Sequence, residues 1–110
     1  MRHDYENPGP SRDEVDRLGG ATLLEFGTSW CGFCHAAQPL IAAAIRDFPA
    51  VRHIKAEDGS GRPLGRSFGV KRWPTLVFLR DGREVAKLVR PQSEQQIRHG
   101  LEQITAAGVE

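Results

Sequence analysis

The stretch WCGFC, residues 30–34, holds both cysteines of the 110-residue chain, Cys31 and Cys34, and His35 follows it. Two cysteines at this spacing are compatible with half of a zinc site, a haem-attachment site or a dithiol that cycles with a disulfide. A purely structural disulfide is a poor interpretation, because so short a loop constrains the unfolded chain little. The sequence on either side of the pair has to decide among the others.

The residues before and after the pair predict a strand followed by a helix. Residues 21–26 form a short, mostly apolar run, typical of a strand that is buried on both faces. From Phe33 to Phe48 the apolar residues recur at helical spacing, in a segment that contains Pro39. Cys31 is therefore expected at a helix N-terminus, where unpaired N–H groups favour a thiolate. The thiolate is the nucleophile of disulfide exchange, and Cys34 would lie one helical turn further on.

The rest of the chain continues this alternation of helices and strands. The expected elements are a short helix opened by Ser11-x-x-Glu14, a weak strand over 51–56, a short helix after 60–63, a strand over 75–79, a hairpin turn at 81–82, a returning strand over 84–89, and a helix opened by Ser93-x-x-Gln96. The order predicts an α/β fold, with a mixed central sheet and helices on both faces. Residues 1–10, rich in Pro and Gly, are predicted to be a flexible N-terminal arm, and residues 11–110 a single domain.

Zinc and haem are the alternatives to redox chemistry. A structural zinc site needs four ligands, and besides the cysteines only scattered histidines are available, namely His3, His35, His53 and His99. The letters CGFCH match a haem-attachment motif, but the only methionine is Met1, so the common methionine axial ligand is missing. We therefore expect no metal and no cofactor.

The composition argues against several classes of partner. The chain is 39% hydrophobic and 26% charged with a net charge of +1, which argues against bulk attraction to nucleic acid or membranes. No apolar run approaches the roughly 18 residues that span a bilayer. Residues 1–17 lack the hydrophobic region of a secretory signal. We expect a cytoplasmic monomer, unless a leader has been removed.

Two segments resemble the thioredoxin family. The first, LEFGTSWCGFC at 24–34, is similar to the family's active-site segment, with Pro39 where the family kinks its active-site helix. The second, FGVKRWPT at 68–75, is similar to the segment that leads into the family's cis-proline. The likeness covers about residues 15–106. It implies the thioredoxin fold, Cys31 as the attacking thiolate and Cys34 as the buried resolving thiol.

The resemblance also implies a proton acceptor behind the dithiol. Glu25 stands where the family places a buried acid, and Lys55 resembles the lysine that pairs with it. We expect burial to raise the pKa of Glu25, so that it takes the proton of Cys34 when a mixed disulfide resolves. A structural Glu25–Lys55 ion pair without a catalytic role is the alternative.

The resemblance further implies a substrate groove, whose expected residues are Trp30, Gly32, Phe33, Trp73, Pro74 and Arg90. Pro74 resembles the cis-proline that offers backbone groups to an extended client segment. The chain departs from the family pattern at three places: Gly-Phe between the cysteines, Trp73 before the proline, and Arg90 where a glycine is usual. These departures leave the reduction potential and the choice of client open.

The sequence thus predicts a thiol–disulfide oxidoreductase that reduces protein disulfides. Its partners would be disulfide-containing client proteins and an upstream reductase. A disulfide oxidase or isomerase of an oxidising compartment is one alternative, and a redox-inert binding module of the same fold is another.

Overall fold

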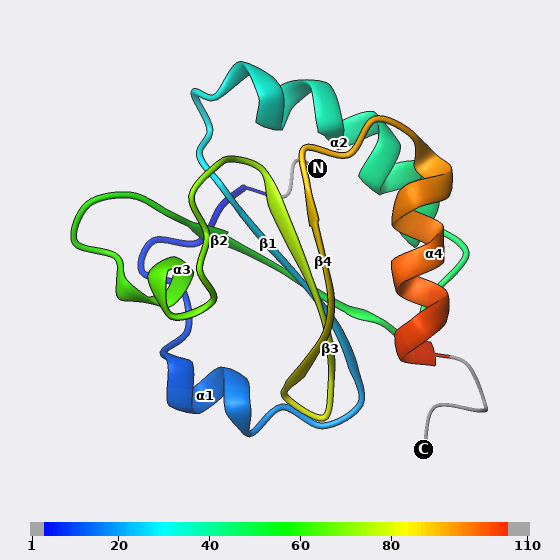
Figure 1. Ribbon diagram of the computed structural model, residues 1–110, viewed down its shortest axis with the longest axis horizontal. Helices are drawn as coiled ribbons and strands as arrows, with labels where there is room; N and C mark the ends of the chain where they lie inside the picture. The colour runs from blue at the N-terminus through cyan, green and yellow to red at the C-terminus, as the bar shows by residue number, and fades with distance from the viewer. Residues whose placement is uncertain (1–3, 106–110) are drawn as a thin grey trace.

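The computed structural model describes residues 4–105, and the helices and strands follow one another in the predicted order (Figure 1). Their bounds are α1 Arg12–Asp16, β1 Ala21–Gly27, α2 Gly32–Ile45, β2 Arg52–Glu57, α3 Pro63–Ser67, β3 Thr75–Arg80, β4 Arg83–Val89 and α4 Glu94–Thr105. The predicted capping box opens α1, since Ser11 and Glu14 each bond the backbone N–H of the other. Pro39 lies inside α2.

The four strands form one mixed sheet in the order β2-β1-β3-β4. Strand β1 runs parallel to β2 and antiparallel to β3, and β3 pairs antiparallel with β4. The β3–β4 hairpin turns at Asp81 and Gly82, whose φ angles of 53° and 80° match the turn that two-residue hairpins favour. In the β1–β2 register Glu25 of an interior strand lies opposite Lys55 of the edge strand β2.

Helices cover both faces of this sheet, which confirms the predicted α/β layers (Figure 1). One core cluster joins Leu23 and Phe78 to residues of α2 and α4. The other joins Leu24 and Phe26 to residues of α1 and α3. Because side chains alternate along a strand, Glu25 shares the face of Leu23 and points toward α2.

The N-terminal segment lies against the sheet, which differs from the loose arm expected over residues 1–10. The Glu6 N–H donates to Lys55 O at 2.7 Å, and the Glu57 N–H donates to Glu6 O at 3.0 Å. These bonds place residues 5–7 beside β2, whose outer edge would otherwise present unpaired backbone groups. Residues 1–3 lie outside the described part of the chain.

Candidate active site

Cys31 and Cys34 lie at the N-terminus of α2. Cys31 is the N-cap residue, with φ −88° and ψ 121°, and its Sγ accepts a hydrogen bond from the Cys34 N–H at 3.3 Å. Cys31 keeps 8% of its surface exposed, whereas Cys34 is fully buried. An approaching disulfide can therefore reach only the first sulfur.

The Cys34 thiol is held in its protonated form. The pKa of this thiol is raised to about 12, mainly by burial and in second place by the contact with Cys31. The neighbouring Thr28 backbone and Tyr5 hydroxyl lower it in part. At neutral pH this thiol needs a proton acceptor before it can act as a nucleophile.

A hydrogen-bonded network surrounds the carboxylate of Glu25, which is fully buried. The Tyr5 hydroxyl donates to Oε2 at 2.5 Å, and the Gln38 Nε2 donates to the same oxygen at 2.9 Å. The His53 Nε2 lies 2.9 Å from the other oxygen, Oε1. Lys55 joins the network through Gln38, because its Nζ donates to the Gln38 Oε1 at 2.9 Å.

These donors reverse the expected ionisation of Glu25. Burial alone would raise its pKa, as predicted, but hydrogen bonds from His53, Tyr5 and Gln38 favour the charged form and outweigh burial. The pKa of Glu25 is therefore held below its ordinary range, and the expectation of a raised pKa is wrong. At neutral pH the residue is a carboxylate with its lone pairs already engaged.

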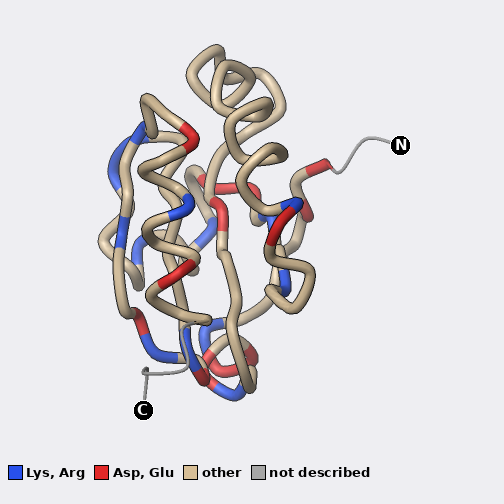
Figure 2. Tube along the Cα trace, turned by 90° about the vertical axis from the view of Figure 1, so that its right-hand side faces the viewer, with Lys and Arg blue, Asp and Glu red and all other residues tan. Residues whose placement is uncertain are grey.

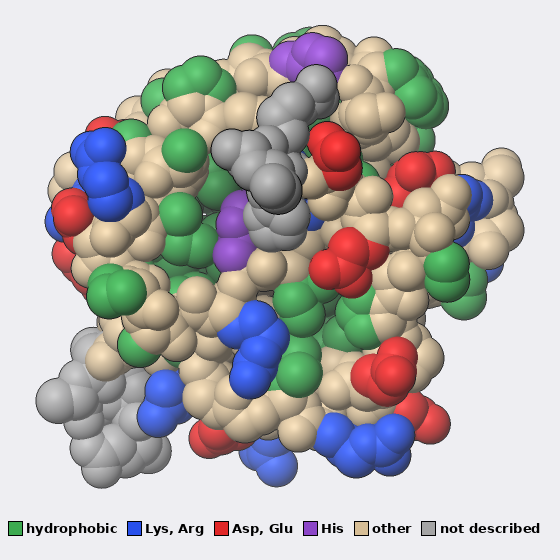
Figure 3. All heavy atoms as spheres, turned by 180° about the vertical axis from the view of Figure 1, so that it is seen from behind, with side chains coloured by type: hydrophobic (Ala, Val, Ile, Leu, Met, Phe, Trp, Pro, Cys, Tyr) green, Lys and Arg blue, Asp and Glu red, His purple; other side chains and the backbone are tan. Residues whose placement is uncertain are grey.

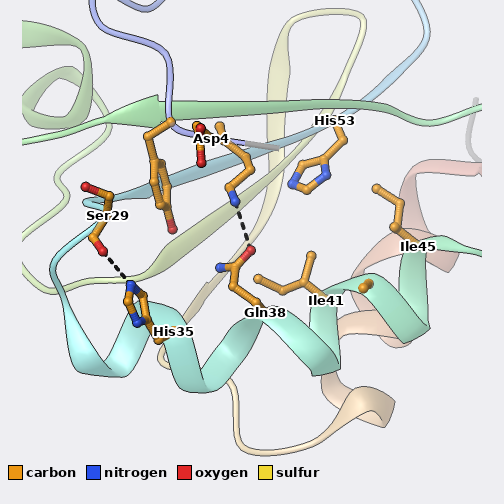
Figure 4. Close-up of a pocket in the computed structure, with 10 residues that line it drawn as sticks. Asp4, Ser29, His35, Gln38, Ile41, Ile45 and His53 are labelled. Atoms are coloured by element: carbon orange, nitrogen blue, oxygen red, sulfur yellow. Dashed lines mark hydrogen bonds between the residues drawn. The ribbon is translucent and has the colours of Figure 1, made fainter. Parts of the chain in front are cut away.

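An open hollow of about 440 Å³ borders this network (Figure 4). Gln38, Ile41 and Ile45 rise from α2 toward His53 of β2 in this view, and Lys55 lines the hollow as well. His35 lies at one end, with a ring nitrogen against the Ser29 carbonyl oxygen. The hollow gives solvent access to the groups that hold Glu25, although Glu25 itself is enclosed.

Two aromatic contacts form the rim around Cys31. Trp30 is 73% exposed, and its ring meets that of Trp73 edge-on, with the centroids 5.6 Å apart. The Arg90 guanidinium lies 3.8 Å from the centroid of the Phe33 ring, which is the geometry of a cation–π contact. The predicted groove residues Trp30, Phe33, Trp73 and Arg90 thus come together from three separate parts of the chain.

The Trp73–Pro74 peptide bond is cis, and Pro74 is buried behind the rim. Arg90, directly after β4, holds this segment, since its backbone N–H donates to Pro74 O and its Nε donates to Trp73 O, both at 2.9 Å. Arg90 has a φ of 50°, in the left-handed region that favours glycine. This backbone conformation fits the glycine that is usual in the family at this place.

Two further predicted residues lie exposed on the helix. Phe33, counted on the helical apolar face, is 57% exposed and belongs to the rim, so its place in the core pattern is wrong. Gly32 is exposed, and a side chain there would have nothing within 4 Å.

The helix that carries the dithiol has no formally charged side chain of its own, and the nearest cation of the rim is Arg90. Helix α2 carries no Lys, Arg, Asp or Glu, and it is uniformly uncharged in Figure 2. From behind, Lys, Arg, Asp and Glu side chains are spread over the lower end, the two sides and the middle of the molecule (Figure 3).

Three members of the Glu25 network were missed from the sequence: Tyr5, Gln38 and His53. Side chains alternate along β2, which places His53 on the same face as Lys55, and Gln38 lies one helical turn after Cys34. The spacing in the sequence could therefore have predicted that these two residues lie near Glu25. The position of Tyr5 could not be predicted in this way, because it depends on the pairing of Glu6 with β2.

Comparison with known proteins identifies the family. The thioredoxin family model matches residues 12–103. The chain belongs to the thioredoxin family.

A thioredoxin of Chlamydia muridarum is 38% identical over 71 residues, which cover 64% of this chain and 69% of that protein. An H-type thioredoxin of Oryza sativa subsp. indica is 30% identical over 87 residues, covering 79% and 71% respectively. The solved structure of reduced thioredoxin 2 from Pseudomonas aeruginosa PAO1 superposes with a TM-score of 0.87 at 57% identity, covering 98% of this chain and all of that one.

Membership of the thioredoxin family assigns the WCGFC stretch to redox chemistry. The chain is a thiol–disulfide oxidoreductase that acts on protein disulfides, and thioredoxins do this without a cofactor. Within residues 4–105, no three His, Cys, Asp or Glu side chains are grouped to hold a metal ion. No helix in the same range is long and apolar enough to cross a membrane.

The raised pKa of Cys34 predicts a loss of stability in alkali. Between the thiol's ordinary pKa of about 8.5 and its folded value of about 12, the unfolded chain is ionised and the folded chain is not. The folded reduced protein then binds more protons, so its stability falls by up to about 1.4 kcal/mol per pH unit in this window. Urea unfolding of reduced wild type and Cys34→Ala at pH 8 to 11 measures this, and the variant should lack that part of the slope. Parallel pH profiles would contradict the buried, protonated thiol.

Proposed function

We propose that the protein is a reductant of protein disulfides that works as a cytoplasmic monomer and is recharged by a reductase. The observation that favours a reductant over an oxidant is that few contacts stabilise the reduced, dithiol form of the Cys31–Cys34 pair. The Cys31 sulfur accepts a hydrogen bond from the neutral Cys34 backbone N–H, and Cys34 is a thiol that resists ionisation. Strongly oxidising members of this chemistry owe their potential to a stabilised reduced form.

The proposed cycle begins when the Cys31 thiolate attacks a client disulfide. A bond forms between Cys31 Sγ and one client sulfur, and the other client sulfur leaves as a thiolate. Cys31 then carries no thiol or charge, so its raising effect on the Cys34 pKa is removed. Cys34 loses its proton and attacks Cys31 Sγ, forming the Cys31–Cys34 disulfide and releasing the second client thiolate. Two electrons pass to the client, and a reductase returns them.

The rim favours binding of client proteins that present an apolar extended segment beside their disulfide. Trp30 and Phe33 offer exposed aromatic surface on either side of Cys31. Arg90 already uses its guanidinium on Phe33 and on Trp73 O, so it narrows the groove more than it offers a free charge. A folded client would have to present its disulfide on a protruding loop.

The proposed compartment rests on cysteine usage. Both cysteines belong to the dithiol, and none is left for a structural disulfide, as is usual where thiols are kept reduced. A disulfide oxidase or isomerase of an oxidising compartment is the second candidate, and its potential separates it from the first.

The reduction potential should lie in the range of a reductant. Equilibrating the Cys31–Cys34 couple against glutathione should give a value at or below about −220 mV, near the cytosolic poise. A value at or above about −180 mV would contradict the proposed direction and favour the oxidase or isomerase.

Single cysteine substitutions should separate the two halves of the cycle. With dithiothreitol as electron source the wild type should reduce insulin, and Cys31→Ser should abolish this because the nucleophile is gone. Cys34→Ser should still attack but should remain joined to the client as a mixed disulfide, seen by non-reducing electrophoresis. An inactive wild type would favour a redox-inert binding module.

A further inference from the structure

The hydroxyl of Tyr5 lies between the resolving thiol and the buried carboxylate. It donates to Glu25 Oε2 at 2.5 Å, and it lies close enough to the Cys34 side chain to act on the pKa of that thiol. A methyl group placed on Gly27 would lie 2.6 Å from Cys34 Sγ and 2.7 Å from the Tyr5 oxygen. The space in which these two groups meet therefore exists only because residue 27 is a glycine.

Contacts of Glu6 and Lys55 hold Tyr5 at this place. The backbone bonds of Glu6 fix the neighbouring residue to the edge of β2. The Lys55 ammonium lies 4.6 Å from the centroid of the Tyr5 ring, as in a cation–π contact. Tyr5 is the only tyrosine of the chain, so its hydroxyl is the only phenol available for this position.

We propose that Tyr5 is a catalytic residue that relays the Cys34 proton to Glu25 when the mixed disulfide resolves. This inference rests on the reducing cycle proposed above. The S–H bond of Cys34 breaks as its proton moves to the Tyr5 oxygen, and the Tyr5 proton moves to Glu25 Oε2. In the same step the Cys34 Sγ–Cys31 Sγ bond forms and the client sulfur leaves with the electron pair of the broken disulfide. A carboxylate is a weak base for a thiol, so proton loss and sulfur attack proceed together and no free thiolate accumulates.

Glu25 and the hollow beside it provide a route by which the transferred proton can leave. Glu25 from β1 is the anionic end of the relay, and its second oxygen contacts His53 from β2. His53, Lys55 and Asp4 line the solvent-open hollow, so a proton held on Glu25 can exchange there with water. Helix α2 adds Cys34 and Gln38 on its side, and its His35 lines the hollow as well; it carries no Lys, Arg, Asp or Glu.

The test follows the two halves of the reaction with an aromatic disulfide, dithiobis(nitrobenzoate), under single-turnover conditions. The reduced protein releases one coloured thiolate when Cys31 attacks and a second when Cys34 resolves the adduct. In Tyr5→Phe, which keeps the ring, the first phase should keep its rate and the second should slow at least about tenfold at pH 7. Raising the pH should restore the second phase, because hydroxide then replaces the relay.

Two further variants make the result specific to the relay. Glu6→Gln changes an exposed side chain on the same segment without altering its backbone pairing, and both phases should match the wild type. Glu25→Gln should slow the second phase, and the double variant with Tyr5→Phe should be no slower than the slower single variant. Additive effects would mean that the two residues do not act in one chain.

A second form of this kinetic test leaves the fold unchanged and uses the fact that the chain has a single tyrosine. Biosynthetic incorporation of fluorotyrosine changes this hydroxyl alone, and it makes the phenol oxygen a weaker acceptor for the thiol proton. The second phase should slow while the first is unchanged. An unaltered second phase in Tyr5→Phe and in the fluorinated protein would overturn the relay, whereas a wild type that reduces no disulfide would overturn the proposed function.

Discussion

The Glu25 carboxylate, buried in the central strand of the sheet, is the constraint around which the site is arranged. An ionised carboxylate in a protein interior is costly unless hydrogen bonds compensate for the lost water. Here the compensation comes from three parts of the chain: the N-terminal segment through Tyr5, α2 through Gln38 and β2 through His53. Satisfying this charge therefore fixes the position of the helix that carries the dithiol.

This arrangement separates the two thiols by environment, although they are three residues apart. Cys31 faces an aromatic, weakly charged rim and is reachable by a client. Cys34 faces the interior, where burial keeps it protonated until a mixed disulfide forms. The outer sulfur can thus begin an exchange at any encounter, while the inner sulfur responds only once a client is attached. That order of events suits a protein that must release its clients quickly.

The fold and the dithiol could be predicted from the sequence, because both depend on local sequence patterns. The capping box at Ser11, the Asp81–Gly82 turn and the change of period at Cys31 are readable within a few residues. The ionisation of Glu25 was not readable, because its direction depends on donors that tertiary structure brings together. Tyr5 was hidden for the same reason, since its segment contains Asn7-Pro8-Gly9-Pro10, a composition typical of a linker. Phe33 kept the helical period yet lies exposed on the rim, where its ring meets the Arg90 guanidinium.

The ionisation state of Glu25 at neutral pH tests this account most directly. The side-chain carboxyl carbon of Glu25 in the reduced protein can be followed by carbon-13 NMR across the pH range, assigned with Glu25→Gln. The account predicts a titration below the ordinary glutamate value of about 4.3 and a carboxylate at pH 7. A titration above neutral pH would mean that Glu25 is protonated in the working protein, and the carboxylate could not accept the Cys34 proton.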